Sequence, residues 1–253
     1  MSKPIIFYDL LRKGPEGQSD SEKSWSPNTL KTRLALNIKG LQFKTEWLSF
    51  VAIGPKMKEL GVPPRADAEG LKYTIPTIYD PNTGKTVTES LAIAKYLDKT
   101  YPDTPRLVAS GTAGLQEAYL EKVVTPFMYT MMVYLVYPAF KQSCVTQADE
   151  EYLRKKGQAL MGKQPEDMVL QGEAITTACK SLSASLGAMA QHVFANGGDA
   201  VFVTGDSPSH VDTAIASILS YIIKTAGKDH ALSKVIMEHS WANNYLEAMS
   251  EWR

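Results

Sequence analysis

Strand-like and helix-like segments occupy separate parts of this 253-residue chain. Runs rich in β-branched and aromatic residues, bounded by glycine, proline and polar turns, occur in the first part. They predict strands over residues 4–10, 42–48, 73–80 and 86–87. After the breaker Tyr101–Pro105, apolar residues recur at helical spacing and strand patterns almost disappear. We therefore expect an α/β domain over residues 1–104 and an all-helical domain over residues 105–253.

Helices are expected at defined places in both parts. A helix between the first two strands makes a βαβ unit, a short helix fits within residues 54–65, and another helix opens at Glu89–Ser90 and runs to Thr100. Pro76 is disfavoured in a central strand, so its strand begins there, where a cis peptide bond is allowed. The second domain is expected to hold helices over residues 115–142, 148–161, 166–194, 209–226 and 232–249.

The stretch from Ser24 to Leu41 combines a polar turn with the first of these helices. Apolar residues every four positions over residues 30–38 stripe one helical face. Ser26 is the expected N-cap, Pro27 the first helical residue, and Gly40 ends the helix. Backbone N–H groups at a helix N-terminus favour an anion such as a thiolate. The alternative is that Ser26 only caps the helix.

Composition and charge exclude several classes of function. Lys+Arg 27 balances Asp+Glu 27, so no overall field favours nucleic acid or an anionic membrane. We expect neither a signal peptide nor a membrane span, because apolar runs are short. Cys144 and Cys179 form neither a metal motif nor a disulfide framework, so no metal is expected. A reducing cytoplasmic compartment is the expectation.

Four motifs occur in order along the chain and at fitting distances. The first is Ser26-Pro27 followed by Lys39-Gly40-Leu41, and the second is Thr74-Ile75-Pro76-Thr77. The others are Thr88–Ile93 and the capping box within Thr204–Asp212. Together these motifs make the chain resemble a cytosolic glutathione transferase. The Trp-Ser-Pro-Asn start and the long loop Arg12–Lys23 resemble the etherase-like group, namely the fungal class A enzymes and the bacterial β-etherases. The resemblance implies a thioredoxin-like N-terminal domain and glutathione as cosubstrate.

The resemblance also implies roles for individual residues. Ser26 falls on the catalytic hydroxyl, with Ser24 as the alternative. Glu89 would pair with the ammonium of the γ-glutamyl end, and Ser90 would hold its carboxylate. Lys56, Lys58, Arg65 and Lys72 are all candidates for the glycyl carboxylate. The expected glutathione-binding residues are Trp25, Asn28, Lys56, Lys72, Thr74, Ile75, Pro76, Glu89 and Ser90.

Activation of glutathione needs a modest stabilisation of its thiolate. A free thiol has a pKa near ~8.5, and lowering it by ~2 units requires about 2.7 kcal/mol. One hydrogen bond from Ser26 to the charged sulfur, at about 1.5–3 kcal/mol, together with a helix N-terminus could supply this. The Asn28 amide has two further donors.

The second substrate is expected between the two domains. The segment Pro126–Tyr137 is rich in Met and Tyr, whose side chains adapt to bulky apolar ligands. Most of these residues also suit a hydrophobic core. The residues expected to face a hydrophobic ligand are Tyr8, Phe127, Met128, Met131 and Met132, with Trp25 nearby.

The expected function is therefore transfer of glutathione to a hydrophobic aromatic or phenolic electrophile, including cleavage of an aryl ether. One alternative is a carrier that binds aromatic compounds without turnover, and activity with electrophiles would discriminate the two. A thiol–disulfide reductase would need a cysteine where Ser26 stands. The resemblance implies a homodimer, and neither nucleic acid nor a membrane is an expected partner.

Overall fold

A four-stranded sheet organises the first domain of the computed structural model, which describes residues 3–66 and 72–253. The strands are ordered β2-β1-β3-β4. β1 (Ile5–Leu10) is parallel to β2 (Phe43–Leu48), whereas β3 (Thr77–Asp80) is antiparallel to both β1 and β4 (Lys85–Thr88). The four expected strands are confirmed, with β3 shorter than its apolar run.

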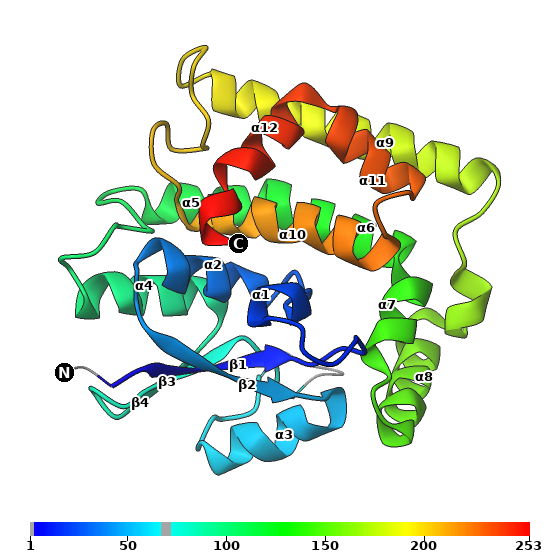
Figure 1. The fold of residues 1–253 in the computed structure, drawn as a ribbon, viewed down its shortest axis with the longest axis horizontal. Helices are drawn as coiled ribbons and strands as arrows, with labels where there is room; N and C mark the ends of the chain where they lie inside the picture. The colour runs from blue at the N-terminus through cyan, green and yellow to red at the C-terminus, as the bar shows by residue number, and fades with distance from the viewer. Residues whose placement is uncertain (1–2, 67–71) are drawn as a thin grey trace.

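Helices cover both faces of this sheet. α2 (Leu30–Ile38) and α4 (Ser90–Thr100) lie between the sheet and the second domain, and α3 (Phe50–Glu59) lies on the other side (Figure 1). Phe7 and Ile78 of the sheet share a buried cluster with Leu36, Ile93 and Leu97 of α2 and α4. The thioredoxin-like α/β domain is confirmed.

The start of α2 differs from the prediction. Its regular part begins at Leu30, with Thr29 at the N-cap position, rather than at Pro27 after a Ser26 cap. The Ser26 carbonyl already accepts from the Leu30 N–H at 3.0 Å, so residues 27–29 form a turn that leads into the helix. The Ser26 hydroxyl accepts only a long contact of 3.4 Å from the Asn28 N–H. It is therefore a weak cap and keeps its own proton.

The segment Arg12–Lys23 is anchored and contains a short helix, α1 (Asp20–Lys23), which the sequence analysis missed. Ser19 and Glu22 form a capping box at its start. Arg12 donates to the Glu22 carbonyl at 2.6 Å and to the Gln142 side chain at 3.1 Å. The segment is thereby tied to the helical domain.

The structure also fixes the start of α3 and the state of the peptide bond before Pro76. α3 begins at Phe50, earlier than predicted, and contains Pro55. The Ile75–Pro76 bond is cis, as the position of Pro76 at the start of its strand allowed.

The second domain is helical throughout its described elements, as expected, but some predicted helices are broken. The first breaks near Leu135, and its two parts are bent by 77°. A π-helical turn precedes Pro126, whose ring cannot fit against the carbonyl four residues earlier in a regular helix. The elements are α5 (Ala113–Tyr119), η1 (Leu120–Val124), α6 (Thr125–Tyr134), α7 (Val136–Ser143), α8 (Gln147–Met161), η2 (Pro165–Met168), α9 (Glu173–Phe194), α10 (His210–Ala226), α11 (Ala231–Glu238), α12 (Ser240–Ala248) and η3 (Ser250–Trp252).

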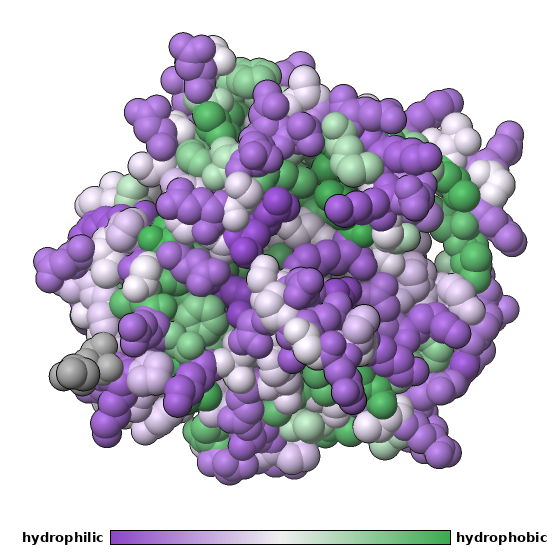
Figure 2. Space-filling view, in the orientation of Figure 1, coloured by the Kyte–Doolittle hydropathy of each residue, from purple (hydrophilic) through white to green (hydrophobic). Residues whose placement is uncertain are grey.

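α10 is the buried centre of this domain and packs against α2 of the first (Figure 1). The predicted capping box is present: Ser209 and Asp212 exchange hydrogen bonds at the start of α10. The surface in Figure 2 is mostly hydrophilic with scattered hydrophobic residues. Among the described helices none alone meets the length and hydropathy of a membrane span, although Ala113–Tyr134 with Val136–Ser143 meets them as a bent pair.

Candidate functional site

The residues Ser24 to Pro27, here called the serine turn, present two hydroxyls in different surroundings. Ser24 is fully buried, and its hydroxyl donates to Asp9 Oδ2 at 3.1 Å. Ser26 is 5% exposed, and its oxygen accepts from the Asn28 N–H. In residues 3–66 and 72–253, no acceptor lies within hydrogen-bond distance of the Ser26 proton. Of the two hydroxyls, only that of Ser26 has a proton free for a ligand.

A buried ion pair lies beneath the serine turn. Arg33 of α2 contacts Asp9 Oδ2 at 3.0 Å, and both side chains are almost completely buried. The Arg33 guanidinium lies over the rings of Phe7, Phe43 and Trp47 at 5.2–5.4 Å from their centroids. Asp9 therefore links Ser24 of the turn to a cation fixed in the sheet and α2.

Sheet register gathers the three N-terminal motifs at one end of the sheet. Trp25 Nε1 donates to the carbonyl of Leu10, the last residue of β1. Tyr8 of β1 pairs with Thr77, which directly follows the cis Ile75–Pro76 bond. Thr77 in turn pairs with Thr88, which directly precedes Glu89. Segments far apart in the sequence thus bring the serine turn, the cis-proline and the Glu89–Ser90 helix start together.

Glu89 adopts a backbone conformation that non-glycine residues rarely adopt. Its φ of 70° is the only positive value among the described non-glycine residues, and its side chain is 59% exposed. Arg65 Nη1 lies 4.0 Å from Glu89 Oε1. Ser90 is the first residue of α4, so its backbone N–H lies at a helix N-terminus. A strained turn with a carboxylate, next to a helix start that no side chain caps among the described residues, suits a zwitterionic ligand end.

The candidate cations for the glycyl carboxylate differ in their partners. Lys56 is ion-paired with Glu46 at 3.0 Å and with Glu59 at 3.1 Å. Hydrogen bonds to these two carboxylates raise the pKa of Lys56. Lys72 is exposed, and its carbonyl accepts from the Arg65 N–H at 2.9 Å. The backbones of Lys72 and Arg65 are therefore in contact, shortly before the cis-proline in the sequence.

Lys31 is a residue that the sequence analysis missed. It lies on α2, is partly buried, and its Nζ is 3.8 Å from the Met128 sulfur on α6. Burial lowers the pKa of Lys31 to about 8, and the negative charge of Glu89 opposes this shift. Lys31 thus places a cation between the two domains and within the field of Glu89. No signal in a single sequence distinguishes it from a solvated helix lysine.

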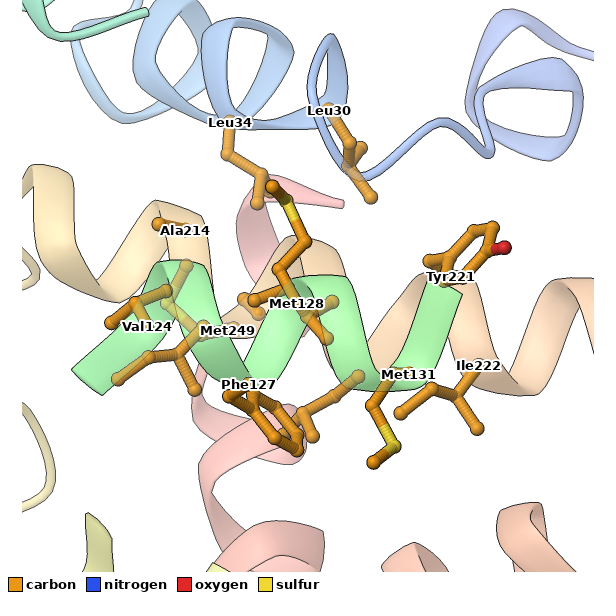
Figure 3. Close-up of a cluster of buried hydrophobic side chains, with 14 of the residues drawn as sticks. Leu30, Leu34, Val124, Phe127, Met128, Met131, Ala214, Tyr221, Ile222 and Met249 are labelled. Carbon is orange, nitrogen blue, oxygen red and sulfur yellow. The ribbon is translucent and has the colours of Figure 1, made fainter. Parts of the chain in front are cut away.

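The residues expected to face a hydrophobic ligand are mostly in the core. Phe127, Met128 and Met131 of α6 are at most 7% exposed. Figure 3 shows Met128 directed toward Leu34 of α2. Met132 is partly buried.

Tyr8 also belongs to this buried cluster. It is 4% exposed, and Glu46, Lys56 and Glu59 are among the charges that act on its hydroxyl. The exposed side of α6 instead holds a shallow hollow lined by Tyr129, Thr130, Val133 and Tyr134.

Comparisons with known proteins identify the family of both domains. Residues 25–100 match the family described as "Glutathione S-transferase, N-terminal domain", and residues 114–252 match "Glutathione S-transferase, C-terminal domain". The domain boundary predicted after residue 104 lies between these two matches and stays a prediction. A glutathione S-transferase-like protein of Aspergillus flavus is 39% identical over 115 residues, which are 44% of this chain and 40% of that protein.

Two solved fungal structures are similar over nearly their full length. A glutathione transferase from Phanerochaete chrysosporium has a TM-score of 0.88 at 30% identity, covering 100% of this chain and 98% of that one. A glutathione S-transferase of Ceriporiopsis subvermispora, solved in complex with glutathione, has a TM-score of 0.87 at 32% identity, covering 99% and 98%.

Proposed function

Because the chain belongs to the glutathione S-transferase family, whose N-terminal domain takes glutathione as cosubstrate, we propose that it is a transferase that activates the glutathione thiol at Ser26. The observation that carries this proposal is the free proton of the Ser26 hydroxyl. Ser24 cannot serve in the same way, since its proton is donated to Asp9. Ser26 is therefore preferred over Ser24.

In the proposed reaction each of the gathered motifs has one task. The backbone of Ile75, before the cis bond, pairs with the cysteinyl part of glutathione, and Glu89 pairs with the γ-glutamyl ammonium. The Ser26 hydroxyl donates to the sulfur, which stabilises the thiolate by about 1.5–3 kcal/mol relative to the thiol. The thiolate forms a carbon–sulfur bond with the electrophile, and the leaving group departs with its electron pair and takes up a proton.

The second substrate is proposed to be a hydrophobic aromatic or phenolic compound that enters where α2 and α6 meet. The contact between Lys31 and Met128 marks this boundary, and Met side chains adapt to bulky ligands. Cleavage of an aryl ether and membership of the etherase-like group are the finer proposals. They are supported by the Trp25–Asn28 sequence and the insert that carries α1.

We propose that the protein acts in the cytoplasm, because Cys144 and Cys179 are free thiols, as a reducing compartment favours.

We also propose a homodimer, in which a second copy covers exposed apolar residues of α6 such as Val133, at 49% exposure. A monomeric mass in light scattering across micromolar concentrations would contradict the dimer.

The decisive test is the ultraviolet absorbance of the glutathione thiolate on the protein, titrated against pH. We expect the wild type to hold a thiolate at neutral pH, and Ser26→Ala to raise the pKa of the bound thiol by about 1–2 units, because a hydrogen bond to a charged group is lost. Ser24→Ala is the matched control and is expected to shift the pKa of the bound thiol less than Ser26→Ala does. Ser26→Ala with an unchanged thiol pKa would exclude Ser26. Binding of glutathione with no thiolate band would favour the carrier.

A further inference from the structure

Two side chains of α10 contact the backbone of the serine turn from the helical domain. The Ser217 hydroxyl lies 2.9 Å from the carbonyl oxygen of Pro27 and 2.7 Å from that of Ala214, so its single proton is shared between them. Lys224 Nζ donates to the carbonyl of Ser24 at 2.6 Å. The first and last residues of the turn are therefore both held from α10.

A third residue of the same helix contacts the middle of the turn. The ring of Tyr221 packs against that of Trp25, with centroids 6.1 Å apart. Figure 3 shows Tyr221 projecting from α10 toward the end of α2 where Leu30 lies. Ser217, Tyr221 and Lys224 follow each other at intervals of four and three residues, which places them on one face of a helix. We call these three residues the α10 face.

The first domain holds the same turn from the opposite side. The Ser24 hydroxyl donates to Asp9, and Trp25 Nε1 donates to the Leu10 carbonyl at 3.2 Å. Ser26 lies between Trp25 and Pro27, and both of these neighbours contact α10. None of these contacts involves the Ser26 hydroxyl itself, so they fix its position without occupying its proton.

We propose that the α10 face positions the Ser26 hydroxyl for the glutathione sulfur, with Lys224 and Ser217 as positioning residues that act through the backbone of the serine turn. This inference rests on the proposed function. It assigns part of the thiol activation to the helical domain, which the sequence analysis had associated only with the second substrate.

The physical basis is the steep geometry of hydrogen bonds. A hydrogen bond prefers a donor–hydrogen–acceptor angle above ~150° and weakens steeply when that angle falls below ~120°. A shift of ~1 Å in a positioned catalytic group can cost ~100-fold in rate. A turn held at its ends and its middle from α10, and at two residues from β1, cannot move the Ser26 oxygen freely.

Lys224 is suited to this task because carbonyls are its closest partners. It also donates to the Ser21 carbonyl at 2.6 Å, and the described residues include no carboxylate within ion-pair distance of it. Burial, followed by repulsion from Arg12, Arg253 and Arg33, lowers the pKa of Lys224 to about 8, while Asp9 opposes this shift. The ammonium is thus directed at the serine turn and the insert before it.

The test uses matched substitutions on α10. Lys224→Met removes the donors and keeps an apolar stem, Lys224→Arg restores charge and donors, and Ser217→Ala removes one hydroxyl. Ser220→Ala is the control, because the Ser220 hydroxyl is also buried on α10 but has no hydrogen-bond partner among the described residues. Ser217→Ala keeps the test valid if Lys224→Met fails to fold.

The readouts are the pKa of the bound glutathione thiol, from its thiolate absorbance, and the dissociation constant of glutathione by calorimetry. We expect Lys224→Met and Ser217→Ala to raise the thiol pKa by about one unit, which lowers the ratio of thiolate to thiol about tenfold at a given pH. The dissociation constant at low pH, where the thiol is protonated, should change by less than about twofold. Lys224→Arg should restore most of the activation, and Ser220→Ala should match the wild type. Thermal unfolding of the same samples verifies that each variant is folded.

Two outcomes separate this inference from the proposed function. If Ser26→Ala raises the thiol pKa while Lys224→Met and Ser217→Ala leave it unchanged, the α10 face has no positioning role and the inference is wrong. If wild-type protein binds glutathione without any thiolate band, the proposed function itself fails. Equal loss of affinity and activation in Ser217→Ala and Ser220→Ala would also overturn the inference, because it would reflect packing alone.

Discussion

The two ends of the proposed glutathione site are built in different ways. The serine turn at the thiol end is buried and held from both domains. Glu89 at the γ-glutamyl end is mostly exposed, with a loose contact of 4.0 Å to Arg65. The difference follows the forces that each end uses. Hydrogen bonding to a thiolate depends on short-range geometry, whereas attraction between charges falls off slowly with distance. Rigidity is therefore found where angles and distances determine reactivity.

The largest expected effect concerns the ion pair beneath the thiol end. Asp9→Asn removes the buried counter-charge of Arg33 and leaves only the longer pair with the half-exposed Asp20, at 3.8 Å. We therefore expect the free energy of unfolding to fall by about 3–5 kcal/mol. Urea denaturation measures the change. Glu121→Gln, in the exposed pair of Glu121 with Lys122, is the control and should leave stability unchanged. A similarly small effect of Asp9→Asn would mean that Asp20 and the aromatic rings around Arg33 suffice to stabilise its charge.

The next effect concerns the charge of Glu89. Glu89→Gln keeps the shape of the side chain and removes its attraction for an ammonium, so we expect glutathione to bind about three- to tenfold more weakly, or ~0.7–1.4 kcal/mol. The pKa of the bound thiol should stay at its wild-type value. Calorimetry and the thiolate titration measure both quantities. A raised thiol pKa in Glu89→Gln would break the comparison, because it would show that the two ends are coupled.

The last prediction concerns stability rather than binding, through the backbone strain at the γ-glutamyl end. Glycine adopts a φ of 70° without steric cost, whereas alanine does not. We expect Glu89→Gly to be more stable than Glu89→Ala by about 1 kcal/mol in denaturant unfolding. Both variants lose the same carboxylate, so the difference reports the native-state strain less the extra entropy of glycine in the unfolded chain. Equal stability of the two variants would show that the surrounding turn relaxes when the side chain is removed.

Local signals in the sequence were sufficient for much of the fold. Alternation and β-branched residues located the strands, and the Ser209–Asp212 box located the start of α10. The position of Pro76 fitted the cis bond. Where local signals compete, the prediction was wrong. Pro27 favours a first helical position, but the turn that holds Ser26 delays regular α2 to Leu30. The Ser19–Glu22 box was present in the sequence and would have located α1.

The part of the candidate site that the sequence did not predict depends on contacts between residues far apart in the chain. Asp9 and Ser24 are 15 positions apart, and Lys224 reaches Ser24 over 200 positions. Neither spacing has a periodic signature, so no pattern in the sequence connects these residues. The helical spacing of Ser217, Tyr221 and Lys224 was visible, but not the partner they face. Motifs identified the candidate groups, and the structure supplied the residues around them.

The contacts of α10 with residues near the N-terminus have a consequence for the order in which this protein folds during synthesis. The Pro27 carbonyl accepts a hydrogen bond from Ser217, which is 190 positions later in the chain. The Ser24 carbonyl accepts one from Lys224, which is 200 positions later. A domain emerging from the ribosome at ~5–20 residues per second can form its sheet early. Its serine turn can reach its final shape only after α10 has been synthesised and docked. Competence for thiol activation is thus expected as one of the last events in biogenesis, after both domains have folded.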